Sequence, residues 1–129
     1  QLTPQIDIDA YLKFEEITPE FLTYLRMFNP FGPGNQKPTF CTKNVLDYGT
    51  SKLVGKNMEH IKLELVDNSS AKVLNGIAFN MSQYFDYIKS GQPFDICYTI
   101  EGNKHPNSSN KYQLAVKEIR INSQTEIKR

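Results

Sequence analysis

Residues 72–100 read KVLNGIAFNMSQYFDYIKSGQPFDICYTI, and this stretch decides the fold class. Both of its ends are short apolar runs with β-branched and aromatic residues, which are typical of β-strands. Between the two runs, Asn80 is a favoured N-cap, Gln83 completes a variant of the capping box and Gly91 is a common helix stop. The stretch therefore predicts strand, helix and strand, in that order.

Turn-rich segments separate further short strands on both sides of this stretch. The predicted strands lie at about 40–54, 60–66, 72–79, 94–100 and 112–121. Five short strands with one helix between the third and the fourth form the element order of the OB-fold, a partly open Greek-key barrel that often binds oligonucleotides or oligosaccharides. We therefore predict a mainly β domain with a five-stranded OB-fold barrel.

The residues before the barrel predict one short strand and one helix. Residues 6–13 alternate apolar and polar side chains, which is the pattern of a strand with one solvent-exposed face. Thr18 as N-cap and Pro19 as the first helical residue begin a helix over 18–28. Its apolar residues recur at helical spacing and are expected to pack as one stripe, formed by Phe21, Leu25 and Phe28.

A rigid turn, PFGPGN at residues 30–35, follows the helix. Its two prolines and two glycines exclude both a helix and a paired strand. We therefore predict a strand-helix connector over residues 1–36, with Phe31 packed as part of it. The OB-fold nucleic-acid-binding domain is then expected over residues 37–129.

Composition places the chain among soluble single domains. Its 129 residues are about one domain's worth, with 39% hydrophobic and 22% charged residues. No apolar run approaches the roughly 18 residues that a membrane span needs. Two cysteines are too few for a disulfide scaffold, so we expect a cytoplasmic protein with no membrane partner. Because the chain starts with Gln1 and shows no leader pattern, we expect a fragment of a longer protein.

The net charge of +1 is too small to indicate a nucleic-acid partner by itself. The charges are nevertheless divided along the chain, because acidic residues dominate 1–20 and lysines dominate 36–62. Any basic surface is therefore expected to be local.

Catalytic chemistry is not indicated by these residues. His60 and His105 lie on different elements, and neither has a carboxylate at metal-ligand spacing. The glycines of the PFGPGN turn precede a strand rather than a helix, which argues against a phosphate-binding loop. Cys41 and Cys97 lie within predicted strands, where a cysteine is usually a buried hydrophobic residue. The sequence therefore predicts no catalytic residue, no metal site and no cofactor in this chain.

A binding surface has more support. If Ile61 and Leu63 fill the barrel, then His60 and Lys62 face outward on the second strand, a surface that OB-folds commonly use. The loops between strands one and two and between strands four and five add lysines beside tyrosines, whose rings can stack on bases. The candidate nucleic-acid-binding residues are Lys43, Tyr48, Lys52, Lys56, His60, Lys62, Lys104, His105, Lys111 and Tyr112.

The same residues also have a purely structural interpretation. Lysines solubilise most protein surfaces, and a tyrosine on a strand is more often half-buried packing than a binding residue. The charge pattern alone leaves nucleic-acid binding and an ordinary surface equally open.

An ordered set of motifs spans nearly the whole chain: IxIDA at 6–10, PFGPGNxxPxF at 30–40, VG at 54–55, HxKL at 60–63, GIAF at 76–79 and QLxVxxI at 113–119. This set resembles the C-terminal region of the RecJ family of single-stranded-DNA-specific exonucleases. In the loop before the last strand, His105 stands where that family usually has an aromatic residue, and Asn107 stands in the place of a glycine.

The resemblance implies an OB domain that binds single-stranded DNA in a 5′ to 3′ exonuclease of DNA repair and recombination. It also implies an upstream DHH phosphoesterase core and a DHHA1 domain as partners within the same protein, with manganese or magnesium bound by that core. This chain contains no Asp-His-His motif, so we expect it to be inactive alone. A single-strand-binding protein is a further expected partner.

Two alternatives belong to other classes of function. In the first alternative, the domain is a protein-interaction module that docks on the nuclease core or on a single-strand-binding protein. The other alternative is a carbohydrate-binding OB-fold, against which the absence of tryptophan counts.

Overall fold

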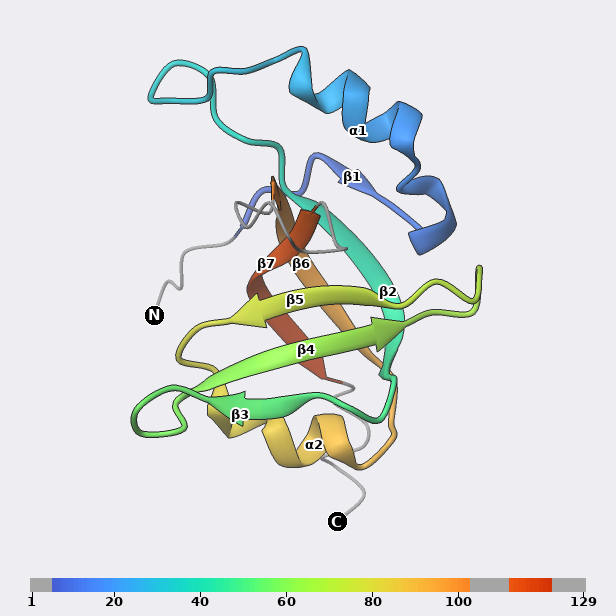
Figure 1. Ribbon diagram of the computed structural model, residues 1–129, viewed down its shortest axis with the longest axis vertical. Helices are drawn as coiled ribbons and strands as arrows, with labels where there is room; N and C mark the ends of the chain where they lie inside the picture. The colour runs from blue at the N-terminus through green and yellow to red at the C-terminus, as the bar shows by residue number, and fades with distance from the viewer. Residues whose placement is uncertain (1–5, 103–111, 122–129) are drawn as a thin grey trace.

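The computed structural model describes residues 6–102 and 112–121. A small β-barrel forms the centre of the molecule, with helix α1 (Pro19–Arg26) above it and helix α2 (Phe85–Lys89) below it (Figure 1). In this described part of the chain, no helix is both long enough and apolar enough to cross a membrane. Two 3-10 helices, η1 (Phe14–Glu16) and η2 (Ser82–Tyr84), and seven strands complete the elements: β1 (Ala10–Tyr11), β2 (Phe40–Asp47), β3 (Lys52–Val54), β4 (His60–Val66), β5 (Leu74–Ala78), β6 (Phe94–Gly102) and β7 (Tyr112–Ile121).

Five of these strands close the barrel. The order in the sheet is β1-β2-β6-β7-β5-β4-β3, and an additional pairing between β2 and β4 closes the ring. Strands β2 and β3 together form the first strand of the OB order, because both pair antiparallel with β4. With α2 between β5 and β6, the predicted OB-fold is confirmed.

Gly76 permits the barrel to close between β5 and β7. It lies opposite Leu114 in the parallel pairing of these strands. A Cβ atom at Gly76 would lie 3.0 Å from the backbone oxygen of Leu114 and 3.3 Å from its Cβ atom. These contacts are tighter than nearly all real Cβ contacts, so a side chain at this position would require β7 to shift by a few tenths of an ångström.

The core inside the barrel follows the predicted pattern on β4. Ile61, Leu63 and Leu65 are all fully buried there. The hydroxyl group of buried Tyr98 forms a hydrogen bond of 2.7 Å with Oγ1 of Thr42, so this polar group has a partner inside the core. Burial raises the pKa of Tyr98 above its usual value.

The first predicted strand, 40–54, is interrupted at residues 48–51. Gly49 has a φ of +120°, a conformation that favours glycine, and the backbone N–H of Ser51 donates to Oδ1 of Asp47 at 3.1 Å. This bend turns the chain from β2 into β3. The other four predicted strands agree with the structure to within two residues at each end.

The predicted start of the second helix is wrong. Asn80 has a φ of +58°, and the helical segment begins at Ser82 with Met81 in the N-cap position, where no side chain caps the helix. The backbone N–H of Asn80 instead donates to Nδ1 of His60 at 2.9 Å, which holds this residue in the preceding turn. The predicted stop is confirmed, because Gly91 follows α2 with a φ of +86°.

The connector contributes directly to the barrel's core. Residues 6–13 alternate between partly buried and exposed side chains as predicted, although only Ala10 and Tyr11 pair with β2. Phe14 and Ile17, which follow them, are 0% and 1% exposed and belong to the main core cluster. The backbone N–H of Phe14 also donates to Oδ2 of Asp67 at 2.8 Å. Connector and barrel thus share one core, and a domain boundary at residue 36 stays a prediction.

Helix α1 begins as predicted but packs less tightly than expected. The hydroxyl group of Thr18 accepts a hydrogen bond from the N–H of Phe21, and Phe21 and Leu25 pack against the core. Phe28 is 46% exposed and contacts Tyr24 on the outer side of the helix, so its predicted place in the buried stripe is wrong. α1 ends at Arg26, so Phe28 lies beyond the helix whose apolar side packs against the core.

Asn35 fixes the turn after α1. Its side-chain amide donates to the backbone oxygen of Phe28 at 2.6 Å and to that of Pro30 at 3.0 Å. The backbones of Gly32 and Asn35 exchange two further hydrogen bonds. Phe31 is partly buried within this turn, as predicted.

Candidate nucleic-acid interface

The outer surface of β3, β4 and β5 brings residues from three strands into rows. Lys52 on β3 lies opposite Lys62 on β4, which in turn lies opposite Ile77 on β5. Side chains of directly opposite residues in an antiparallel pair point to the same face. We call this surface the lysine face and define it by Lys52, Val54, His60, Lys62, Ile77 and Phe79.

The two paired lysines are both exposed. Among the ion pairs of the described residues, none involves Lys52 or Lys62. Like charges directly opposite each other on neighbouring strands repel and lower stability. An anion between them would reduce that repulsion.

An exposed aromatic ring lies at one end of the lysine face. Phe79 is 60% exposed, and the ring of His60 meets it edge to face at a centroid distance of 5.0 Å. His60 is itself held by the hydrogen bond from the N–H of Asn80 and lies 3.6 Å from Oε2 of Glu59. The pair thus presents a fixed aromatic surface on which an unpaired base can stack.

Phe79 was missed by the sequence analysis, although the sequence carries a signal for it. Leu74, Gly76 and Ala78 alternate along β5 and are buried. The same period-2 alternation places Ile77 and Phe79 outward. Two large apolar side chains at outward positions of one strand indicate an exposed apolar surface.

The loop between β3 and β4 borders the aromatic pair and carries Lys56. The carboxylate of Glu59 organises this loop by accepting a hydrogen bond from the N–H of Asn57 at 3.0 Å. Backbone N–H groups of Glu59 and Asn57 lower the pKa of this carboxyl group. Gly55 has a φ of +104°, and a Cβ atom there would lie 2.5 Å from Oε1 of Glu59. The loop therefore holds exposed Lys56 beside the lysine face in a defined shape.

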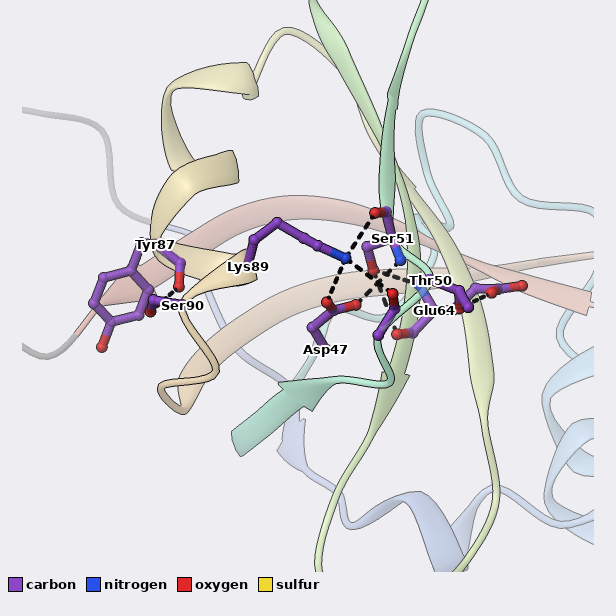
Figure 2. A network of polar contacts seen from close by, with 8 residues as sticks. Asp47, Thr50, Ser51, Glu64, Tyr87, Lys89 and Ser90 are labelled. Carbon is purple, nitrogen blue, oxygen red and sulfur yellow. Dashed lines mark hydrogen bonds and ion pairs between the residues drawn. The ribbon is translucent and has the colours of Figure 1, made fainter.

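A network of polar contacts fixes the bend from β2 to β3 (Figure 2). The ammonium group of Lys89 on α2 lies 2.9 Å from Oδ2 of Asp47 and also donates to the backbone oxygens of Gly49 and Ser51. The hydroxyl group of Ser51 accepts from the N–H of Glu64 at 2.9 Å. Burial alone would raise the pKa of Asp47, but the bonds from Lys89 and Ser51 outweigh it, and the pKa lies below its usual value.

Two of the predicted site residues lie outside the lysine face. Lys43 is on β2 with its ammonium group 5.7 Å from the centre of the Tyr11 ring on β1, a cation–π contact on another part of the barrel wall. Tyr48 is 59% exposed in the bend, and its N–H donates to the backbone oxygen of Glu64. It therefore borders β4 without belonging to the lysine rows.

The remaining predictions concern the loop between β6 and β7. Tyr112 at the start of β7 is partly buried, and burial raises its pKa. Lys104, His105 and Lys111 lie outside the described residues. In the ranges 6–102 and 112–121, no group of three or more histidine, cysteine, aspartate or glutamate side chains could hold a metal ion.

Comparison with known proteins shows the family to which this chain belongs. A family model of the RecJ OB domain matches residues 8–118. The single-stranded-DNA-specific exonuclease RecJ of Bacillus subtilis (strain 168) is 28% identical over 118 residues, which cover 92% of this chain. The chain spans only 14% of the length of that relative.

Proposed function

This chain belongs to the RecJ OB domain family, and from that membership we propose that it is the single-stranded-DNA-binding domain of a RecJ-like 5′ to 3′ exonuclease. The relative from Bacillus subtilis, whose name states specificity for single-stranded DNA, supports this proposal. In this proposal the domain guides the strand to an active site outside the chain.

The observation that carries the proposal is the paired, exposed Lys52 and Lys62 beside the aromatic surface of Phe79 and His60. Lysines that contact phosphates give affinity without reading sequence, because they neutralise backbone charge and release counterions. A ring that stacks on a base is equally tolerant of sequence but needs an unpaired base. Together they favour single-stranded DNA of any sequence.

The proposal places catalysis in an upstream DHH core with its DHHA1 domain. Manganese or magnesium would be bound by that core, and the cytoplasm would be the site of action. The chain alone is then inactive. Incubation of purified chain with labelled oligonucleotide and manganese tests this, and nucleotide release that persists through repeated purification would contradict it.

Binding is tested by fluorescence anisotropy of a labelled thymidine 15-mer at several low salt concentrations. We expect wild-type chain to bind, with an affinity that falls as salt rises. Lys62→Ala and Lys56→Ala should each reduce the slope of log affinity against log salt by about 0.7, because each removes one phosphate contact. Unchanged affinity and slope in both variants would show that DNA does not bind to the lysine face.

A second candidate function is a protein-docking module. It is favoured by the exposed outer side of α1, where Tyr24 is 55% and Met27 is 74% exposed. Failure of the wild-type chain to bind DNA even at low salt would favour this candidate.

A further inference from the structure

A cavity of about 770 Å³ lies where α1 and the PFGPGN turn meet the end of the barrel. Binding sites for small molecules commonly have volumes of roughly 300–1,000 Å³ and predominantly apolar walls. Most of these walls are apolar or aromatic, and they include Leu22, Leu25, Phe31, Ile100 and Tyr112.

Positive charge accompanies these apolar walls. Three cations line the cavity, and two of them have firm partners: Lys37 pairs with Glu101, and Lys72 donates to the backbone oxygen of Ile17 at 2.8 Å. The guanidinium group of Arg26 donates only a 3.3 Å hydrogen bond to Thr23, and it forms no ion pair within the described residues. Arg26 is thus available for an anion, and guanidinium suits phosphate through paired hydrogen bonds.

The cavity reaches the outer surface of β5 at Asn75. Asn75 lines the cavity, and it lies opposite Glu64 on the same outer surface of the barrel as Lys62 and Ile77. Two residues along a strand span about 7 Å, so Ile77 lies about 7 Å along β5 from Asn75. A strand of DNA that runs along β5 from the lysine face would pass Glu64, whose carboxylate accepts a hydrogen bond from Thr50, and would then reach the cavity.

We propose that this cavity receives one unpaired nucleobase of the bound strand, while Arg26 contacts a neighbouring phosphate; this rests on the proposed function. Apolar and aromatic walls fit the planar faces of a base, and the free guanidinium fits the charge of the backbone. A base within a duplex is stacked and paired, so it cannot enter the cavity. The cavity thereby adds a preference for single strands that a lysine surface alone does not supply.

The test compares two tryptophan substitutions near the end of α1. Asn29 is exposed and lines the cavity, whereas Met27 is exposed and does not. Asn29→Trp should block the cavity and reduce affinity for a labelled thymidine 10-mer at least tenfold, and the matched control Met27→Trp should bind as wild type does. Arg26→Gln should reduce the salt slope by about 0.7 while the chain stays folded.

A second measurement locates the base directly. In wild-type chain, millimolar thymidine 5′-monophosphate should shift the backbone amide resonances of Leu25, Arg26 and Ile100, and Asn29→Trp should abolish these shifts. If the 10-mer binds wild type and Asn29→Trp equally, or if the shifts are confined to β3 and β4, the cavity proposal is overturned and the lysine face stands. If the wild type binds no oligonucleotide, both proposals fall.

Discussion

Charged side chains have different partners on two outer faces of the barrel. On the lysine face, Lys52 and Lys62 oppose each other without an ion pair among the described residues. On the outer surface of β2, β6 and β7, which we call the closed face, Arg120 pairs with Glu118, and Asp95 accepts a hydrogen bond from the N–H of Asn44 at 2.9 Å.

The closed face also carries two buried cysteines. Cys41 and Cys97 lie opposite each other across β2 and β6 and are 1% and 0% exposed. The carbonyl of Cys41 accepts a hydrogen bond from the N–H of Leu12, the residue that follows β1. The cations of the two faces are therefore held differently: on the closed face Arg120 pairs with Glu118 and Lys43 lies over the ring of Tyr11, whereas Lys52 and Lys62 have neither kind of contact among the described residues. Cations without such contacts are the ones that a bound anion can use.

The largest expected effect comes from reversing charge on each face. Lys62→Glu should weaken binding of a thymidine 15-mer about tenfold or more at low salt, because it replaces a phosphate contact with a repulsion. Lys43→Glu, on the wall beside β1, should change the affinity less than about twofold. Fluorescence anisotropy measures both, and equal losses in the two variants would abolish the distinction between the faces.

Aromatic truncation gives the next largest effect. Phe79→Ala should weaken DNA binding by about 1–3 kcal/mol, the usual contribution of a base-stacking ring. Tyr11→Ala is the matched control, since Tyr11 is 57% exposed beside Lys43. Both variants should unfold in urea nearly as wild type does. A loss of stability without a loss of affinity in Phe79→Ala would make that ring structural.

The third prediction concerns Asp47, which stabilises the bend beside the lysine face and is not expected to bind DNA. Asp47→Asn removes the ion pair with Lys89 and should destabilise the fold at pH 7 by about 1–3 kcal/mol. Because folding lowers the pKa of Asp47, its contribution is fully present above the unfolded value of about 3.9 and is lost progressively as the pH falls from there through the lower folded-state pKa. Urea unfolding at pH 7 and pH 3 should therefore show a difference between wild type and variant that shrinks at the lower pH.

The last prediction concerns burial at the closed face, where no effect on DNA binding is expected. Burial raises the pKa of Cys41 to about 12, and burial also raises that of Cys97. Both thiols should therefore react with iodoacetamide at pH 8 at least about a hundredfold more slowly in the native chain than in urea. Mass spectrometry follows the reaction, and rapid native labelling would show that the closed face opens.

Much of the fold was predictable because its signals are local. The inward pattern of Ile61, Leu63 and Leu65 lies within one strand, and the breaks at Pro30 and Gly91 depend on one residue's backbone. The start of α2 was not predictable, because Asn80 is held by a hydrogen bond from its N–H to His60, twenty positions earlier in the chain. Phe28 was also mispredicted, because the apolar spacing continues to residue 28 whereas α1 ends at Arg26.

The sequence by itself determined the OB order and the outward direction of Lys62, because side-chain direction alternates along a strand whatever that strand packs against. Only the tertiary structure decided that Lys62 lies opposite Lys52, that His60 supports the exposed ring of Phe79, and that a cavity opens beneath α1. Those features depend on register and docking between segments far apart in the chain. Such geometry is set by how the barrel closes, and no local pattern records it.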